Sequence, residues 1–118
     1  MITIANEPRY LSSIRYNLHL STLRVHKKHK RKSILVARGI RHVADSIRLL
    51  VWVNERDKVV IKSITAMVKE GYIKVNQLEA SYEIISARAK HQVKLEPLRD
   101  SIQYLRDSIT ELKEEFNL

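Results

Sequence analysis

The chain has 118 residues and a formal net charge of +9; 44% of its residues are hydrophobic and 30% charged, with two glycines, two prolines and no cysteine. This length fits a single domain over residues 1–118, and so few glycines and prolines exclude a turn-rich β-sandwich and a disordered, low-complexity chain. The absence of cysteine excludes a disulfide framework and a thiolate metal site, and no stretch is apolar enough to predict a transmembrane helix.

The first predicted helix covers about residues 8–25. Pro8 suits the first turn of a helix, and Asn6 is a candidate cap before it. The apolar residues that mark its inner face are Leu11, Ile14, Leu18 and Val25. The segment before this helix lacks the basic head and long apolar stretch of a secretory signal, so we expect a protein of the cytoplasm, the nucleoid or a virion interior.

A run of basic residues follows, His26-Lys27-Lys28-His29-Lys30-Arg31-Lys32. No helix breaker interrupts it, so the pattern is compatible with a loop and with a helical bridge. Like charges repel one another, and such a run is unfavourable unless water or an anion compensates it. We therefore expect phosphate contacts from Lys27, Lys28, Lys30, Arg31 and Lys32, with a solvated surface loop as the alternative.

The second predicted helix, about residues 33–54, is the most regular element. Its apolar residues repeat at spacings of three and four, which is the period of one helix face. They are Val36, Ile40, Val43, Ile47 and Leu50, with Ala37, Ala44 and Val51 beside them. Arg38, Arg41 and Arg48 fall on the opposite side and are the second group of expected phosphate contacts. We expect Asp45 to pair with Arg41 and Arg48.

Two further helices are predicted, at residues 57–70 and about 76–93. Asp57 is the expected cap of the first, Gly71 its expected end, and residues 72–75 have the pattern of a short strand. The expected inward residues are Val60, Ile61, Ile64, Met67 and Val68 in the first helix, and Leu78, Tyr82, Ile85 and Ala89 in the second.

The C-terminal segment contains a seven-residue repeat. Leu95, Leu98, Ile102, Leu105, Ile109, Leu112 and Phe116 fill alternating a and d positions of heptads. Ile at a and Leu at d favour a parallel two-stranded coiled coil, so we expect a homo-oligomer whose interface is formed by Leu98, Ile102, Leu105, Ile109, Leu112 and Phe116. A terminal helix packed along the chain's own bundle is equally compatible with the repeat.

No motif for catalysis or metal binding is found. The pairs His26/His29 and His42/Asp45 lie among Lys and Arg residues, whose charge repels a cation, and no Gly-rich phosphate loop or nucleophile motif occurs. We therefore expect no enzymatic activity, no cofactor and no metal.

Candidate residues for stacking on nucleobases are Tyr10, Tyr16 and Trp52, although the position of Trp52 beside the apolar stripe favours a place in the core or an interface.

Two resemblances are present. Residues 62–75, Lys-Ser-Ile-Thr-Ala-Met-Val-Lys-Glu-Gly-Tyr-Ile-Lys-Val, resemble the end of a winged-helix domain, where a helix closes and the chain enters the wing. This resemblance implies DNA reading by residues 57–75. The arrangement of a basic helical N-terminal half before an apolar helical remainder is similar in plan to the coat proteins of filamentous archaeal viruses, whose helices wrap DNA.

The distribution of charge carries the functional hypothesis. Residues 1–48 contain eleven Lys and Arg against two acids, whereas residues 49–118 contain eleven of each. An excess confined to one half indicates a surface that faces a polyanion. We predict an all-α bundle of four to five helices, with a basic nucleic-acid-facing half at 1–56 and a core and assembly half at 57–118.

The predicted function is that of a sequence-tolerant architectural protein that coats or packages nucleic acid through phosphate contacts, with double-stranded DNA favoured over RNA. One alternative is a dimeric transcriptional regulator that pairs through residues 95–116. The other is a helical scaffold or membrane-surface protein, whose basic run meets acidic lipid or an acidic partner.

Overall fold

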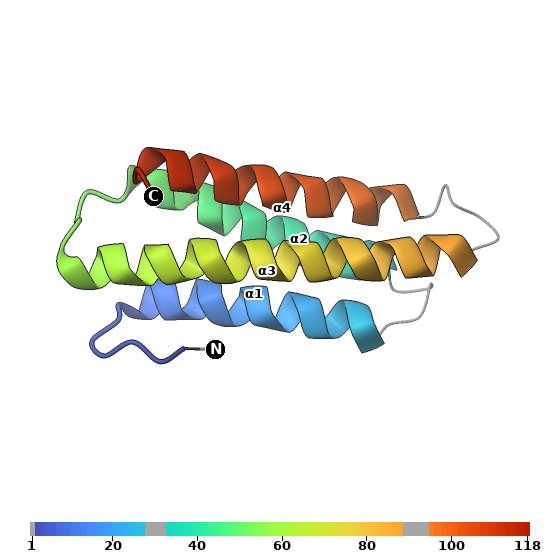
Figure 1. Cartoon of the computed structure of the whole chain (residues 1–118), viewed down its shortest axis with the longest axis horizontal. Helices are drawn as coiled ribbons and strands as arrows, with labels where there is room; N and C mark the ends of the chain where they lie inside the picture. The colour runs from blue at the N-terminus through green and yellow to red at the C-terminus, as the bar shows by residue number, and fades with distance from the viewer. Residues whose placement is uncertain (1, 28–32, 89–94) are drawn as a thin grey trace.

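Four α-helices and one short 3-10 helix make up the fold (Figure 1). A computed structural model describes residues 2–27, 33–88 and 95–118, and the side chains among them except those of residues 22–27 and 33–34. The elements are α1 (Arg9–Lys27), α2 (Ser33–Leu49), η2 (Leu50–Trp52), α3 (Lys58–Arg88) and α4 (Glu96–Glu115). No strand occurs within those ranges, so the prediction of an all-α bundle is confirmed.

The helices form an elongated bundle in which each helix packs against two others. Successive helices run in opposite directions, and the neighbouring pairs are α1 with α2, α2 with α4, α4 with α3, and α3 with α1 (Figure 1). Two of these pairs, α1 with α3 and α2 with α4, therefore run parallel. The residues between α2 and α3 cross the end of the bundle, and α1 lies diagonally opposite α4.

The first two predicted helices are confirmed, with small changes at their ends. The Pro8 carbonyl accepts hydrogen bonds from the backbone N–H groups of Leu11 and Ser12 at 3.0 and 3.1 Å, so Pro8 directly precedes α1. Asn6 lies in the turn before it, with a φ of 63°, a left-handed conformation that Asn tolerates. The apolar stripe of α2 is buried from Val36 to Leu50, as its period predicts.

The third and fourth predicted helices are a single helix of 31 residues, so the predicted stop at Gly71 and the strand at 72–75 are wrong. The cap is confirmed, because the Val60 N–H donates to Asp57 Oδ1 at 2.9 Å. Residues 62–75 are helical throughout, and the resemblance to a winged helix that enters its wing is therefore not supported.

Close packing explains why a glycine lies inside this helix. Gly71 is buried where α3 meets α4, and a Cβ atom there would lie 2.7 Å from Cδ1 of Ile109. Glycine costs a helix interior about 1 kcal/mol relative to alanine, but here it lets the two helices approach. Gly71 was predicted to end a helix; it instead allows a close contact between two helices.

The heptad residues of α4 are buried within the single chain. Leu98, Ile102, Leu105, Ile109, Leu112 and Phe116 are at most 8% exposed and belong to the core cluster that also contains residues of α1, α2 and α3. The structure thus has the terminal helix packed along its own bundle. The predicted coiled coil between subunits is not confirmed, since a partner would reach these side chains only if the bundle opened.

Trp52 is 79% exposed in η2. Trp52 was predicted to lie in the core or in an interface; it does not lie in the core, and the prediction of an interface remains a prediction. Its residue type and its position next to an apolar stripe suggested burial, but α2 ends at Leu49 and the tighter turn of η2 changes the direction of the side chains that follow.

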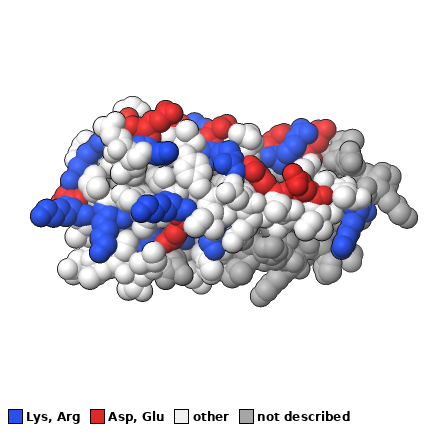
Figure 2. Space-filling model, viewed as in Figure 1, with Lys and Arg blue, Asp and Glu red and all other residues white. Residues whose placement is uncertain are grey.

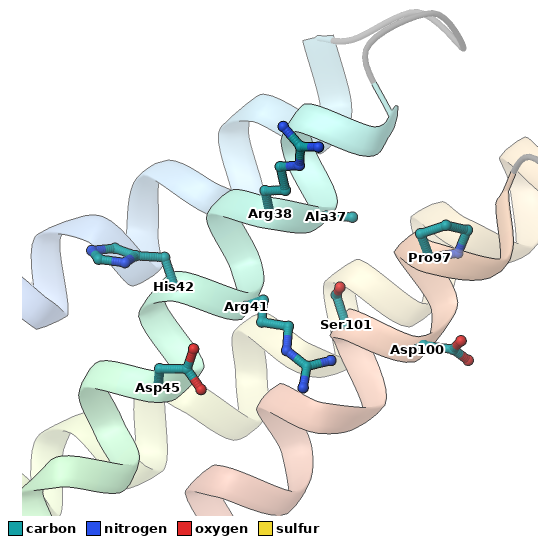
Figure 3. Close-up of a pocket in the computed structure, with 8 residues that line it drawn as sticks. All are labelled: Ala37, Arg38, Arg41, His42, Asp45, Pro97, Asp100 and Ser101. Carbon is teal, nitrogen blue, oxygen red and sulfur yellow. The ribbon is translucent and has the colours of Figure 1, made fainter.

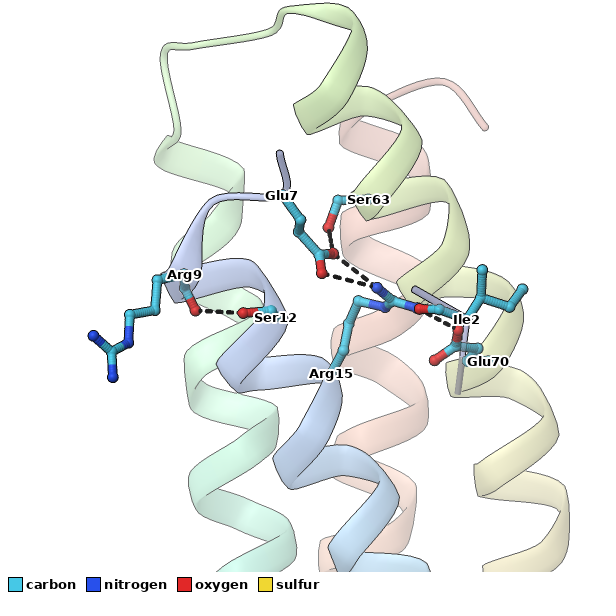
Figure 4. A network of polar contacts seen from close by, with 7 residues as sticks. All are labelled: Ile2, Glu7, Arg9, Ser12, Arg15, Ser63 and Glu70. Carbon is cyan, nitrogen blue, oxygen red and sulfur yellow. Dashed lines mark hydrogen bonds and ion pairs between the residues drawn. The ribbon is translucent and has the colours of Figure 1, made fainter. Parts of the chain in front are cut away.

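A buried charged network ties the N-terminal segment to the bundle (Figure 4). The Arg15 side chain is 1% exposed and donates to both Glu7 carboxylate oxygens at 3.0 and 2.8 Å, to the Ile2 carbonyl at 2.6 Å and to Glu70 Oε1 at 2.7 Å. The Ser63 hydroxyl donates to Glu7. The network therefore links residues before α1, α1 itself and α3.

The charge of Arg15 is retained despite its burial. Burial disfavours the charged form, but the hydrogen bonds and charges of Glu70 and Glu7 outweigh this effect and raise the pKa of Arg15 above its ordinary value. One cation and two carboxylates leave the group with a formal charge of −1. Removal of the cation would leave two carboxylates with no countercharge inside the protein.

Replacing Gly71 with alanine is expected to destabilise the fold, because the loss from the contact with Ile109, about 1–3 kcal/mol for overpacking, exceeds the gain in helix propensity of about 1 kcal/mol. Ile109→Val removes the Cδ1 atom that the new methyl group meets. In a double-mutant cycle measured by urea unfolding, Gly71→Ala with Ile109→Val should lose less stability than the two single changes added together. Strict additivity would contradict the proposed contact.

Replacing Arg15 with methionine is expected to cost about 3–5 kcal/mol of unfolding free energy, because Glu7 and Glu70 lose their buried partner. The matched variant Glu7→Gln removes one carboxylate charge, leaves Arg15 paired with Glu70 and should cost much less. Urea unfolding of both variants measures the difference. An equal loss in both would show that the network contributes through shape and not through charge.

Candidate nucleic-acid interface

Most of the predicted basic run lies outside the described residues. Lys27 is the last residue of α1, and its side chain is not described; Lys28, Lys30, Arg31 and Lys32 fall in the undescribed range 28–32. Chain connectivity still fixes the two points that the run joins. These are the end of α1 and the beginning of α2, which lie at one end of the bundle (Figure 1).

The same end of the bundle holds the second junction of this kind. Helix α3 ends there at Arg88 and α4 begins there at Glu96 (Figure 1). The sequence between them contributes Lys90 and Lys94, and neither undescribed range contains an acid. The two stretches that connect helices at this end therefore carry six formal positive charges, four from 28–32 and two from 89–94.

The three arginines predicted on α2 lie along its junction with α4, and they differ in what they contact. The Arg48 guanidinium donates to Ser108 Oγ at 2.8 Å and to Glu111 at 3.0 Å. Arg48 is therefore occupied within the chain. Its role as a phosphate contact would require it to give up both partners.

Arg41 and Arg48 stack on Tyr104 of α4, with guanidinium carbons 4.2 and 4.3 Å from the ring centroid. The Tyr104 hydroxyl donates to Asp45, and this hydrogen bond, with a smaller effect of burial, raises the pKa of Tyr104 above its ordinary value. Asp45 was predicted to pair with Arg41 and Arg48. Its hydrogen-bond partner is instead a tyrosine from the other helix.

An open groove of about 510 Å³ lies between α2 and α4, toward the end of the bundle at which both helices begin, the basic end (Figure 3). On the α2 side it is lined by Ala37, Arg38, Arg41, His42 and Asp45, and on the α4 side by Pro97, Asp100 and Ser101. Figure 3 shows Arg41 reaching from α2 toward α4, while Arg38 lies one turn nearer the end of the bundle. A helix contact with large side chains would have filled this space.

The basic side chains that line the groove have fewer hydrogen-bond and ion-pair partners within the chain than its carboxylates have. Within residues 2–27, 33–88 and 95–118, the side chains of Arg38 and His42 make no hydrogen bond or ion pair, and Arg41 has its ring contact alone. The carboxylates both have partners, since Asp45 accepts from Tyr104 and Asp100 lies 3.6 Å from Arg99. Arg38 and Arg41 are thus free to bind an anion.

Charge is also segregated between helices. Helix α4 has six carboxylates and three basic residues, a net charge of −3, whereas α1 has four basic residues and no acid. In Figure 2, acidic side chains run along α4 at the upper edge, and basic ones gather over the first turns of α3. A polyanion would therefore avoid the outer face of α4 and approach the bundle from its other sides or from the basic end.

The aromatic residues proposed for stacking on bases are exposed, but they are dispersed. Tyr10, Tyr16 and Trp52 are 44%, 51% and 79% exposed. Burial and the nearby carboxylates of Glu55 and Asp57 raise the pKa of Tyr10, which places it at the bundle end opposite the basic run. None of the three lines the groove.

Tyr104 and Arg15 were not among the residues predicted to form a site. Tyr104 lies next to a heptad position, and that spacing would have placed it at the edge of a helix contact. Arg15 occupies a core position between Leu11 and Leu18, four residues after one and three before the other. A basic residue at such a position is a signal for a buried ion pair.

Among the residues that the structure describes, no three His, Asp or Glu side chains gather as metal ligands. None of the helices, over the same residues, combines the length and apolarity needed to cross a bilayer.

Comparisons of this chain with models of protein families, with curated proteins and with solved structures find no match.

The contacts of the three arginines predict different effects on nucleic-acid binding. Arg38→Gln and Arg41→Gln should each flatten the slope of log K against log salt by up to about 0.9, the value for one lost B-DNA phosphate contact. Arg48→Gln should leave the slope nearly unchanged and lower the urea midpoint, because its partners are Ser108 and Glu111. A slope change for Arg48→Gln as large as for Arg41→Gln would contradict this division.

Proposed function

We propose that this protein binds nucleic acid, with double-stranded DNA favoured over RNA, through phosphate contacts that do not depend on base sequence, and that it coats or packages the nucleic acid. The observation that carries the proposal is the position of Arg38 and Arg41. They have no acidic partner among the described residues and lie within the first nine residues of α2, the helix that follows the basic run in the sequence.

Helix geometry supports a continuous contact surface. At about 1.5 Å per residue, Arg38 lies about 7.5 Å and Arg41 about 12 Å along α2 from Ser33, the residue that follows the run. Successive phosphates of one DNA strand are about 3.4 Å apart along the duplex axis, and the two arginines are about 4.5 Å apart along the helix axis. The run and the two arginines are therefore suited to phosphates of one short segment.

The shape of the bundle sets the expected footprint. Its extents are 49 × 24 × 19 Å. A bundle that contacts DNA by its basic end covers about 24 Å, or about 7 base pairs at about 3.4 Å per pair. A bundle that lies along the duplex would cover about twice as many, so the binding stoichiometry distinguishes the two modes.

Of the alternatives, the regulator loses the feature that favoured it. Residues 57–75 were its expected reading element, and they form part of the continuous helix α3, which has no wing. A contact with acidic lipid shares the electrostatic basis of the proposal, so anionic vesicles serve as one arm of the test.

Replacing the cations of the run with glutamine should weaken binding to random-sequence duplex DNA and flatten the salt slope by up to about 4.5, at about 0.9 for each lost contact. The variant carries the changes at Lys27, Lys28, Lys30, Arg31 and Lys32. Fluorescence anisotropy across a salt series measures the slope, and circular dichroism checks that helicity is retained. The loss should be the same on unrelated sequences, because phosphate contacts carry little base information.

The chain offers a control with the same change in net charge. It replaces five exposed cations away from the basic end with glutamine, at Arg9, Lys58, Lys62, Lys69 and Lys113. The run variant should lose far more affinity than this control. Equal losses would show that net charge alone attracts DNA, and tighter binding to anionic vesicles than to DNA would favour the membrane-surface alternative.

A further inference from the structure

The groove between α2 and α4 combines cations, carboxylates and an apolar floor in one concave space. We propose that it binds a single nucleotide unit, with the phosphate on Arg41 and Ser101 and an amino-bearing base beside Asp100. This inference rests on the proposed function and assigns to it a site for one nucleotide. The unit can be a free nucleotide or one nucleotide of a strand, since both present the same phosphate and base.

The space exists because small side chains face each other across two parallel helices. Ala37 on α2 is 3% exposed and Ser101 on α4 is 5% exposed, so they form the floor. One turn along α4, Tyr104 contacts Arg41 and donates to Asp45, two residues that line the groove. Its volume of about 510 Å³ lies within the range of about 300–1,000 Å³ typical of small-molecule sites.

The phosphate is assigned to the α2 side. Arg41 is held in position by its contact with the Tyr104 ring at 4.2 Å, which leaves its N–H groups available, whereas the Arg38 side chain points away from α4 toward the end of the bundle (Figure 3). The Ser101 hydroxyl makes no hydrogen bond with any of the described residues. Guanidinium groups bind phosphate oxygens in paired hydrogen bonds, and a hydroxyl adds a third donor.

The base is assigned to the α4 side because a carboxylate repels phosphate but accepts hydrogen bonds from amino groups. Asp100 is paired with Arg99 at 3.6 Å, and both side chains are more than half exposed, so this pair is weak and Asp100 can accept from a ligand. Pro97 provides an apolar surface beside it. Because its lining contains a carboxylate as well as cations, the groove differs from a site for a bare anion.

A second groove is less suited to a phosphate-bearing ligand. It measures about 240 Å³, lies between α3 and α4, and is lined by Glu79 and Glu83 together with Arg99. Glu79 already accepts from Arg106 at 2.9 Å. Two carboxylates and a smaller volume do not suit a phosphate-bearing ligand, so the proposal is confined to the groove between α2 and α4.

The test is a heteronuclear NMR titration of the full chain with guanosine monophosphate, guanosine and inorganic phosphate. Guanosine monophosphate should shift the amide signals of residues that line the groove, with a Kd on the order of 1 mM, as expected for a small ligand in an open site. Guanosine and phosphate alone should bind at least tenfold more weakly, because each occupies half of the site. Uridine monophosphate, which has no exocyclic amino group, should also bind more weakly.

Variants assign the contacts. Arg41→Gln should weaken the binding of guanosine monophosphate by about tenfold or more, the loss of one charge-assisted hydrogen bond, whereas the matched change Arg9→Gln on the far end of α1 should have no effect. Asp100→Asn should reduce the preference for guanosine over uridine monophosphate. Because Arg41 and Asp100 are exposed, all three variants are expected to keep the spectrum of the folded chain.

Two results would overturn the proposal: inorganic phosphate binding as tightly as guanosine monophosphate, or no shift at the groove with the nucleotide in large excess over the expected Kd. Anisotropy with a single-stranded oligonucleotide identifies the source. Weaker binding of a guanine-containing oligonucleotide by Asp100→Asn assigns the site to a strand, because loss of a carboxylate would not weaken phosphate contacts alone, and unchanged or tighter binding assigns it to a free nucleotide. The proposed function fails separately, if the run variant binds duplex DNA like its matched control while the groove still takes the nucleotide.

Discussion

The packing of α4 against α2 and α3 is the contact on which the rest of this structure depends. The heptad side chains of α4 fill the core along its whole length, and Gly71 lets α3 come close enough to enclose them. Since the same apolar row cannot serve a partner at the same time, the helix that most suggests assembly is the one that closes the monomer. Any assembly on nucleic acid therefore has to use other surfaces.

That packing also decides which arginines are available. The parallel arrangement of α2 and α4 places Arg48 beside Ser108 and Glu111, and Arg41 over the ring of Tyr104. Toward the basic end the facing residues become small, and the contact opens into a groove with Arg38 at its edge. This interface is thus charge-paired over one half and open as a groove over the other. The proposed phosphate contacts lie on the open half.

The fold class and the first two helices could be predicted because they depend on local patterns. The stripe of Val36 to Leu50 has a helical period whatever surrounds it, and Asp57 caps α3 through a bond three residues away. Gly71 was misjudged because its local cost is offset by Ile109, 38 residues further along the chain. The heptads left two choices open, since an a and d row buries equally well in a bundle and in a dimer.

The candidate site was only partly accessible to prediction for the same reason. Arg38, Arg41 and Arg48 share a helix side, so the pattern grouped them correctly, but their partners come from α4 and depend on its register. Tyr104 and the Asp45 carboxylate meet across 59 residues of sequence, a separation at which no spacing rule applies. Arg15 shows the opposite case. Its place on a core-facing row was a local signal that the prediction did not use, whereas nothing local indicated its partners Glu7 and Glu70.

The parallel pairing of helices has a consequence for how the chain folds. Two antiparallel hairpins, α1 with α2 and α3 with α4, can form from contacts near in sequence, whereas the pairs α1 with α3 and α2 with α4 join residues far apart. Closing long loops costs entropy before these contacts form, which slows folding relative to a bundle whose neighbours are all consecutive. The groove lies between α2 and α4, one helix from each hairpin. Its lining residues therefore come together only after the two hairpins have docked.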